Sequence, residues 1–82
     1  MQRVILVYDV VDDKARAKVA DACLDYGLDR VQYSVFMGKL SRNHQEELMM
    51  YIELLVLETC ANIKLIPINE ADWRKKMEVN YA

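Results

Sequence analysis

The sequence predicts a single α+β domain in which strands and helices alternate along 82 residues. Three observations lead to this: an apolar run without helical period near the start, two segments with apolar residues at helical spacing, and further short runs rich in β-branched and aromatic residues. A chain of this length makes one domain and buries about 60 to 65% of its unfolded surface. No repeat or low-complexity linker divides it, so we expect one domain over residues 1–82.

The first strand is predicted from Val4 to Tyr8 and is followed at once by an acid, Asp9. The apolar run has neither alternation nor a helical period, which favours a central strand covered on both faces. An unpaired carboxylate in the interior would be costly or would take up a proton, so Asp9 is expected where the strand reaches the edge of the sheet and meets water, a metal or a cation. A second interpretation is structural: Asp9, Asp12 and Asp13 simply begin the next helix.

The first helix is predicted from Asp12, its N-cap, to about Tyr26, and Gly27 fits the left-handed position that ends such helices. One apolar stripe marks the face that packs on a sheet. The stripe consists of Ala15, Val19, Ala22, Cys23 and Tyr26. Residues 30–40 then predict either two short strands around Tyr33 and Ser34 or one long bent strand.

The second helix begins at Ser41 or at Asn43, and Asn43 with Glu46 makes a capping box. Its core stripe is Leu48, Ile52, Leu55 and Val56. Further apolar residues leave the helix apolar on nearly every side, which implies a second contact surface. These residues are Met49, Met50, Tyr51, Leu54 and Leu57.

Residues 62–69 predict a strand, and Pro67 places it at an edge or near a terminus. Alternation over residues 76–81 predicts a short last strand. If residues 30–40 form a hairpin, the order is β-α-β-β-α-β. This is the ferredoxin-like layout, with two helices on one face of an antiparallel sheet.

The composition bears on assembly and location. An apolar fraction of 54% is high for so small a chain, so a homodimer interface is expected. The most apolar segment, residues 48–57, is too short to span a bilayer, and Arg3 precedes a strand rather than a signal peptide, so a cytoplasmic protein is expected. Cys23 and Cys60 lack metal-ligand spacing and are expected to be buried free thiols.

The net charge of −2 argues against a strongly basic nucleic-acid footprint. Any face that binds an anion would have to be local. Its candidate residues are Lys14, Arg16, Lys18, Arg30, Lys39 and Arg42.

The order of residues resembles the CRISPR-associated protein 2 family, which works in the adaptation step of CRISPR immunity, nearly from end to end. The strongest mark is Tyr-Gly-x-x-Arg-Val-Gln-x-Ser-Val-Phe-x-Gly-x-Leu over residues 26–40, at the right distance after a strand that ends in Tyr8 and Asp9. A pattern with this many fixed residues is far more specific than a short catalytic motif. Asp13 with Arg16, and the later Ile66-Pro67, extend the likeness.

The resemblance implies a ferredoxin-like homodimer in which the Asp9 side chains of two subunits face each other across the two-fold axis and share one Mg²⁺ or another divalent cation. Family members are described as metal-dependent endonucleases acting on RNA or double-stranded DNA, and others as scaffolds that bridge copies of the CRISPR integrase and hold incoming DNA. The last strand, residues 76–81, is expected to be exchanged with the partner. Carried over by position, Asp9 matches the metal ligand, and the positions tied to activity are Tyr8, Asp9, Arg16, Arg30 and Phe36.

Structural interpretations stand beside these roles. Tyr8 and Phe36 are expected to pack in a core or an interface more often than to stack on bases. Arg30 pairs with Asp29 or Asp12 on the surface in one interpretation, and Lys14 and Lys18 simply form a solvated helix face. A small regulatory domain that binds a metabolite is a third class, but no Gly-rich phosphate loop supports it.

Overall fold

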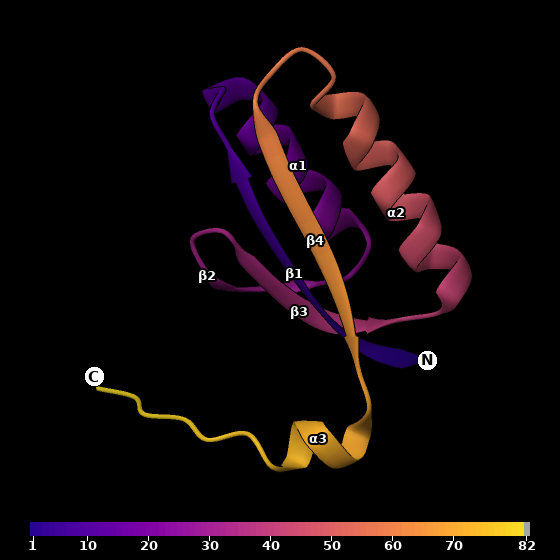
Figure 1. Ribbon diagram of the computed structural model, residues 1–82, viewed down its shortest axis with the longest axis vertical. Coiled ribbons are helices and arrows are strands. Elements are labelled where there is room, and N and C mark those ends of the chain that lie inside the picture. Colours follow the sequence, from indigo (N-terminus) through magenta and orange to yellow (C-terminus); the bar gives the residue numbers. More distant parts are fainter. Residues whose placement is uncertain (82) are drawn as a thin grey trace.

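The computed structural model describes residues 1–81 and contains one antiparallel sheet with two helices on one of its faces (Figure 1). The strands follow the order β2-β3-β1-β4 across the sheet. This is the ferredoxin-like α+β arrangement that the sequence predicts. In chain order the elements are β1 (Gln2–Val10), α1 (Asp13–Asp25), β2 (Asp29–Gln32), β3 (Val35–Leu40), α2 (Arg42–Leu55), β4 (Ala61–Ile68) and α3 (Glu70–Arg74).

The middle segment is a hairpin, which confirms the first of the two alternatives for residues 30–40. β2 and β3 pair antiparallel around the turn at Tyr33 and Ser34. The chain enters the hairpin through Gly27, whose φ of 83° lies in the left-handed region that glycine adopts without cost. Gly38 is needed for a different reason: a Cβ there would come within 2.7 Å of Leu28 Cδ2. The loop after α1 therefore packs directly on β3.

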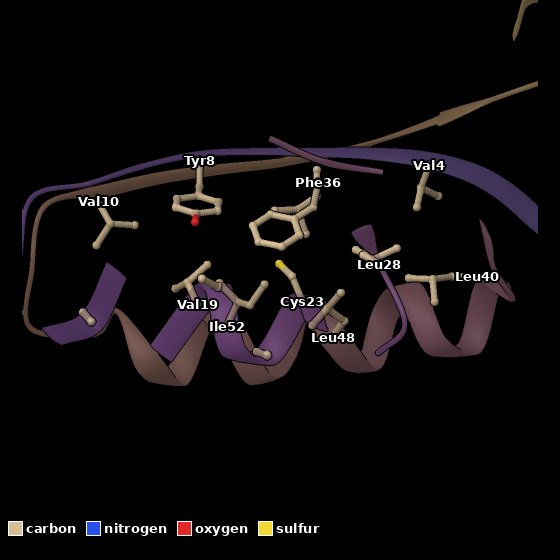
Figure 2. Close-up of a cluster of buried hydrophobic side chains, with 14 residues drawn as sticks. Val4, Tyr8, Val10, Val19, Cys23, Leu28, Phe36, Leu40, Leu48 and Ile52 are labelled. Carbon is tan, nitrogen blue, oxygen red and sulfur yellow. The ribbon is translucent and has the colours of Figure 1, made fainter. Parts of the chain in front are cut away.

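β1 is covered by helices on one face only, which corrects the prediction that both of its faces are covered. Its buried side chains alternate with more exposed ones, and the buried set points at α1 and α2 (Figure 2). That set is Val4, Leu6, Tyr8 and Val10. The prediction was wrong because Ile5 and Val7 on the other face are apolar as well, so hydropathy alone shows no alternation. We call this uncovered side of the sheet the open face.

The caps of the two long helices differ in how well the sequence predicts them. Asp12 caps α1 as predicted, since its Oδ2 accepts a hydrogen bond from Ala15 N at 2.9 Å. α2 is capped by Ser41, whose Oγ accepts from the backbone N–H of His44. Of the two predicted starts, Ser41 is therefore right, and the predicted capping box between Asn43 and Glu46 is wrong.

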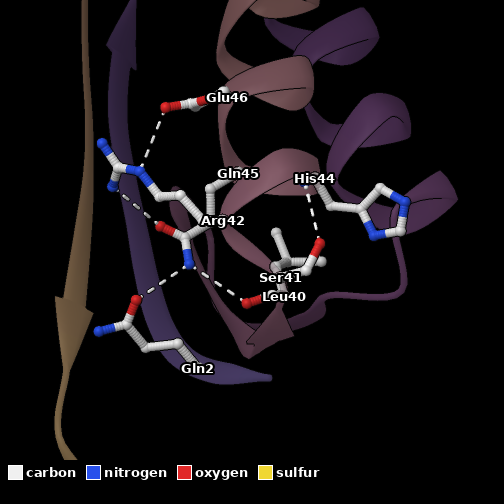
Figure 3. A network of polar contacts seen from close by, with 7 residues as sticks. All are labelled: Gln2, Leu40, Ser41, Arg42, His44, Gln45 and Glu46. Atoms are coloured by element: carbon white, nitrogen blue, oxygen red, sulfur yellow. Dashed lines mark hydrogen bonds and ion pairs between the residues drawn. The ribbon is translucent and has the colours of Figure 1, made fainter.

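The start of α2 is fixed by polar contacts to the neighbouring strands (Figure 3). Gln45 is buried, and its Nε2 donates to Gln2 Oε1 and to the backbone oxygen of Leu40, both at 3.2 Å. Arg42 donates to Glu46 Oε2 at 3.3 Å across one helical turn. The two bonds of Gln45 tie the helix to the ends of β1 and β3, and they leave its side-chain amide satisfied in the core.

The C-terminal region departs from the expected short last strand. Residues 76–81 pair with no strand, and the chain leads away from the sheet after α3 (Figure 1). The sequence analysis did not predict this short helix, although the sequence carries signals for it. Asn69 caps it, and Glu70 and Asp72 lie in its first turn, where acids stabilise a helix. Trp73 anchors it, with the Arg3 guanidinium carbon 4.2 Å from its ring centroid. β4 lies at the sheet edge, as Pro67 predicts.

Two further expectations concern exposed side chains. The outward face of α2 remains apolar and exposed in the single chain, as predicted, through Met50, Tyr51 and Leu54, and Leu57 in the turn after the helix is exposed as well. Cys23 is buried but Cys60 is exposed, which corrects the prediction of two buried thiols, because Cys60 lies in the loop before β4. Over residues 1–81, no helix has the length and apolar character needed to cross a membrane.

Candidate functional site

Asp9 is exposed near the end of β1, on the open face of the sheet. Its cross-strand neighbour is Asn62, and the pair lines a shallow hollow of about 360 Å³ together with Val7, Tyr8 and Lys64. We call this hollow the acidic pocket. Among the described residues, the Asp9 carboxylate has no ion pair. The structural interpretation is right for Asp12, which caps α1, and for Asp13 in its first turn, but it is wrong for Asp9, which lies within β1. Asp9 is free to meet a cation.

Lys64 is a member of the acidic pocket that sequence reasoning missed. Its Nζ donates to Asn62 Oδ1 at 2.9 Å instead of pairing with Asp9. The carboxylate and the ammonium group thus line the same hollow without forming a salt bridge. Strand alternation offered a signal, because Lys64 lies opposite Val7 and therefore on the same face as Asp9.

Tyr8 lies next to Asp9 in sequence but points to the opposite face of the sheet. Its ring is 6% exposed and stacks on Phe36, with the ring centroids 6.1 Å apart. Phe36 itself is wholly buried. Both aromatic rings thus pack in the core, in agreement with the structural interpretation. Both residues nevertheless contact Arg30: the Tyr8 hydroxyl accepts a hydrogen bond from Arg30 Nη2 at 3.3 Å, and the Arg30 guanidinium carbon lies 5.2 Å from the Phe36 ring centroid.

Arg16 and Arg30 come together beside the hairpin turn, around the ring of Tyr33. Their guanidinium carbons lie 5.9 Å and 5.5 Å from its centroid. We call these three residues the arginine cluster. Arg30 pairs with neither Asp29 nor Asp12 among the described residues, so its surface-pair interpretation is wrong.

Arg16 is held in place from two directions. Its Nη1 donates to the backbone oxygen of Val10 at 3.0 Å, and its Nη2 donates to the carboxylate of Asp13. The hydrogen bond that Arg16 donates to Asp13 is the main cause that raises the pKa of Arg16 above its ordinary value, so the guanidinium stays charged. Lys14 and Lys18 are exposed on α1 and form the solvated face that the structural interpretation predicts.

The candidate residues therefore divide into two groups on either side of β1. Asp9 and Lys64 belong to the open face, whereas Arg30 reaches the strand through the hydroxyl of Tyr8, which lies on the helix side. Within one chain the acid and the arginines do not converge on one point.

The acidic pocket offers the type of ligand that a hard divalent cation prefers, but one chain does not offer enough such ligands. A carboxylate, with water and phosphate oxygens, is a usual ligand set for Mg²⁺. Over residues 1–81, no three His, Cys, Asp or Glu side chains come close enough to hold a metal. One chain thus offers the single carboxylate of Asp9, and the remaining ligands would have to come from a second copy, from water or from a phosphate.

The fold and these two groups define a small ferredoxin-like protein with an exposed carboxylate on its open sheet face and a pair of arginines beside the β2–β3 turn. The family model described as CRISPR associated protein Cas2 matches residues 1–76. The chain therefore belongs to the Cas2 family, which confirms the resemblance of its sequence.

Known proteins and solved structures resemble the chain over nearly its whole length. The CRISPR-associated endoribonuclease Cas2 2 of Chloroflexus aurantiacus is 46% identical over 79 residues, which cover 94% of this chain and 93% of the relative. The crystal structure of the hypothetical protein TT1823 from Thermus thermophilus has a TM-score of 0.79 at 28% identity and covers 99% of this chain and 92% of that one. A chain of a partial Cas6-RT-Cas1–Cas2 complex has a TM-score of 0.80 at 26% identity, with 96% and 91% covered.

Proposed function

We propose that this chain works in CRISPR adaptation as a Mg²⁺-dependent endonuclease that hydrolyses phosphodiester bonds of RNA or double-stranded DNA. The observation that carries the proposal is Asp9, an exposed carboxylate that forms no ion pair with any residue of 1–81, at the position that matches the metal ligand of the family. The relative from Chloroflexus aurantiacus is named an endoribonuclease, which makes RNA the first substrate to test.

The active form in this proposal is a homodimer joined through the open faces. The open face is apolar, with Ile5 opposite Met37 on one side and Ile66 on the other, and neither α1 nor α2 covers it; α3 contacts it only at one end, through Trp73. Two copies packed there bring their Asp9 carboxylates close together, where the two negative charges repel each other unless a cation lies between them. One Mg²⁺ then serves both subunits.

Each group has a distinct task in this mechanism. Bound Mg²⁺ would polarise the phosphodiester and lower the pKa of a bound water molecule. Asp9 holds the ion, and Lys64 places a positive charge beside it on the same face. Arg16 and Arg30 bind phosphates further along the strand, because a guanidinium fork fits two phosphate oxygens at once. Tyr8 and Phe36 support this arrangement from the core.

A second candidate function is a catalytically silent scaffold that holds spacer DNA and the CRISPR integrase subunits. Two observations favour it. The chain is structurally similar to a chain of a complex that contains Cas1 and Cas2. The single histidine, His44, lies at the start of α2, near Tyr26 and away from Asp9, so no imidazole is at hand to act as general acid or base.

The decisive test compares cleavage of single-stranded RNA and duplex DNA with Mg²⁺ and with EDTA. The intact protein should cleave only with Mg²⁺, and Asp9→Asn should lose this activity because it removes one charged ligand per subunit. Asp21→Asn is the matched control, since Asp21 is an exposed carboxylate on α1. Equal cleavage by Asp9→Asn would remove Asp9 from the mechanism. No cleavage by the intact protein on either substrate would favour the scaffold.

A further inference from the structure

Tyr33 is a large aromatic side chain that is 68% exposed at the tip of the β2–β3 hairpin. Its backbone is fixed: the carbonyl oxygen of Tyr33 accepts a hydrogen bond from the Tyr8 hydroxyl at 3.5 Å, and the strands on either side pair with each other. The ring itself contributes little to the core. A rigid backbone with a free ring is an arrangement that suits contact with a ligand.

The two guanidinium groups flank this ring without covering it. Their carbons are 5.5 Å and 5.9 Å from its centroid, near the outer limit of about 6 Å for a cation–π contact. Elsewhere in the molecule, Arg3 stacks closely on Trp73 at 4.2 Å, and that ring is largely covered. The comparison shows that Tyr33 keeps ring surface available, and that positive charge lies beside it.

We propose that Tyr33 is a stacking platform for one unpaired base of a single-stranded nucleic acid, with the phosphates next to that base bound by Arg16 and Arg30. Each nucleotide carries a flat base and an anionic phosphate, and the arginine cluster offers a matching surface for both. A base in a duplex already has its faces covered by its neighbours, so only an unpaired base can use the ring. The inference deepens the proposed function and rests on it.

The test measures binding by fluorescence anisotropy in EDTA, where no metal-dependent cleavage occurs. The probes are a labelled uridine-rich RNA, the corresponding thymidine-rich DNA, an abasic strand of the same length and a DNA duplex. Tyr33→Ala should weaken binding of the two base-bearing single strands about 5- to 150-fold, because a stacked base is worth about 1–3 kcal/mol. Tyr33→Phe should bind as the intact protein does, since it keeps the ring.

Matched controls separate stacking from other effects. Tyr51→Ala removes an exposed tyrosine from α2 and should leave binding unchanged. Tyr33→Ala should bind the abasic strand and the duplex as well as the intact protein does, because the arginines remain.

The outcomes distinguish this inference from the proposed function. Equal binding of the base-bearing strands by the intact protein and Tyr33→Ala would overturn the platform and leave the nuclease proposal standing. A loss of the same size on the abasic strand would mean that Tyr33 only positions the arginines, which also overturns it. If the intact protein binds none of the four probes, both proposals fail.

Discussion

Arg30 donates a hydrogen bond from Nη2 to the hydroxyl oxygen of Tyr8 at 3.3 Å, and this bond joins the arginine cluster to the central strand of the sheet. The same hydroxyl donates to the backbone oxygen of Tyr33 in the hairpin turn. The position of Arg30 therefore depends on a side chain whose ring belongs to the core. This explains how a buried residue can affect a surface site without touching a ligand.

Tyr8→Phe should test this link, because it removes the hydroxyl and keeps the ring that stacks on Phe36. We expect the free energy of unfolding to fall by about 0.5–1.5 kcal/mol, the usual net value of a hydrogen bond, as measured by urea denaturation. Binding of nucleic acid should weaken several-fold because Arg30 loses its support. In an Arg30→Met background the substitution should no longer change binding, and a loss of the same size there would contradict the link.

Asp13→Asn should strengthen the binding of nucleic acid. The carboxylate of Asp13 holds Arg16 and adds negative charge where a phosphate would bind. Its removal is expected to raise affinity several-fold at low salt, with a smaller gain at high salt because surface charges are screened. The effect on stability should be small, since the Asp13 side chain is largely exposed. An equal gain in an Arg16→Ala background would show that the effect is only one of net charge.

Asp9→Asn should leave the fold intact in metal-free buffer. If two carboxylates meet at a dimer axis, removing their repulsion keeps the melting temperature unchanged or raises it slightly in EDTA. Mg²⁺ should then stabilise the intact protein and not the variant. A drop of about 1–3 kcal/mol in EDTA would instead identify Asp9 as a structural hydrogen-bonding group.

The tail after α3 should contribute to the dimer. Met77, Val79 and Tyr81 alternate along it and are 96%, 84% and 97% exposed in the single chain. This spacing suits a strand that adds to the sheet edge of a partner through backbone hydrogen bonds. Truncation after Lys75 should weaken the dimer, as measured by light scattering across a dilution series. Replacing the three apolar residues with Ser should do the same, and an unaltered dimer in both variants would rule out the exchange.

The two cysteines should differ in reactivity toward a thiol reagent at neutral to mildly alkaline pH. Burial raises the pKa of Cys23 to about 12, so its thiol stays protonated and shielded in the folded chain. Cys60 is exposed and should react at once. One thiol per native chain and two per denatured chain is the expected count. Because Cys23 ionises more readily when unfolded, its burial favours the native state less and less as the pH rises above its ordinary pKa.

Local signals in the sequence predicted most of the fold. Asp12 and Gly27 mark the ends of α1, and the β-branched and aromatic residues around Tyr33 and Ser34 mark the hairpin. Such features depend on residues near one another in the chain. The uncovered face of β1 was not predicted, because an apolar run looks the same whether a helix or a second protein molecule covers it.

The candidate site was predicted less completely. Asp9 was found because a carboxylate after an apolar strand is conspicuous, whereas Lys64 and Tyr33 were missed. Lys64 reaches the acidic pocket only through the pairing of β4 with β1. Tyr33 occupies a variable position of the motif, so its exposure and its two arginine neighbours were visible only in three dimensions.

The alternation of β1 also has a consequence for how the chain folds. A slip of this strand by one residue against β3 and β4 would exchange its two faces. Leu6 would then turn to water, and the Asp9 carboxylate would enter the apolar layer beneath the sheet, where an unpaired charge is strongly disfavoured. The acid that we propose to hold a metal ion therefore also selects the correct strand pairing. The apolar residues of β1 alone would tolerate both the observed register and the register shifted by one residue.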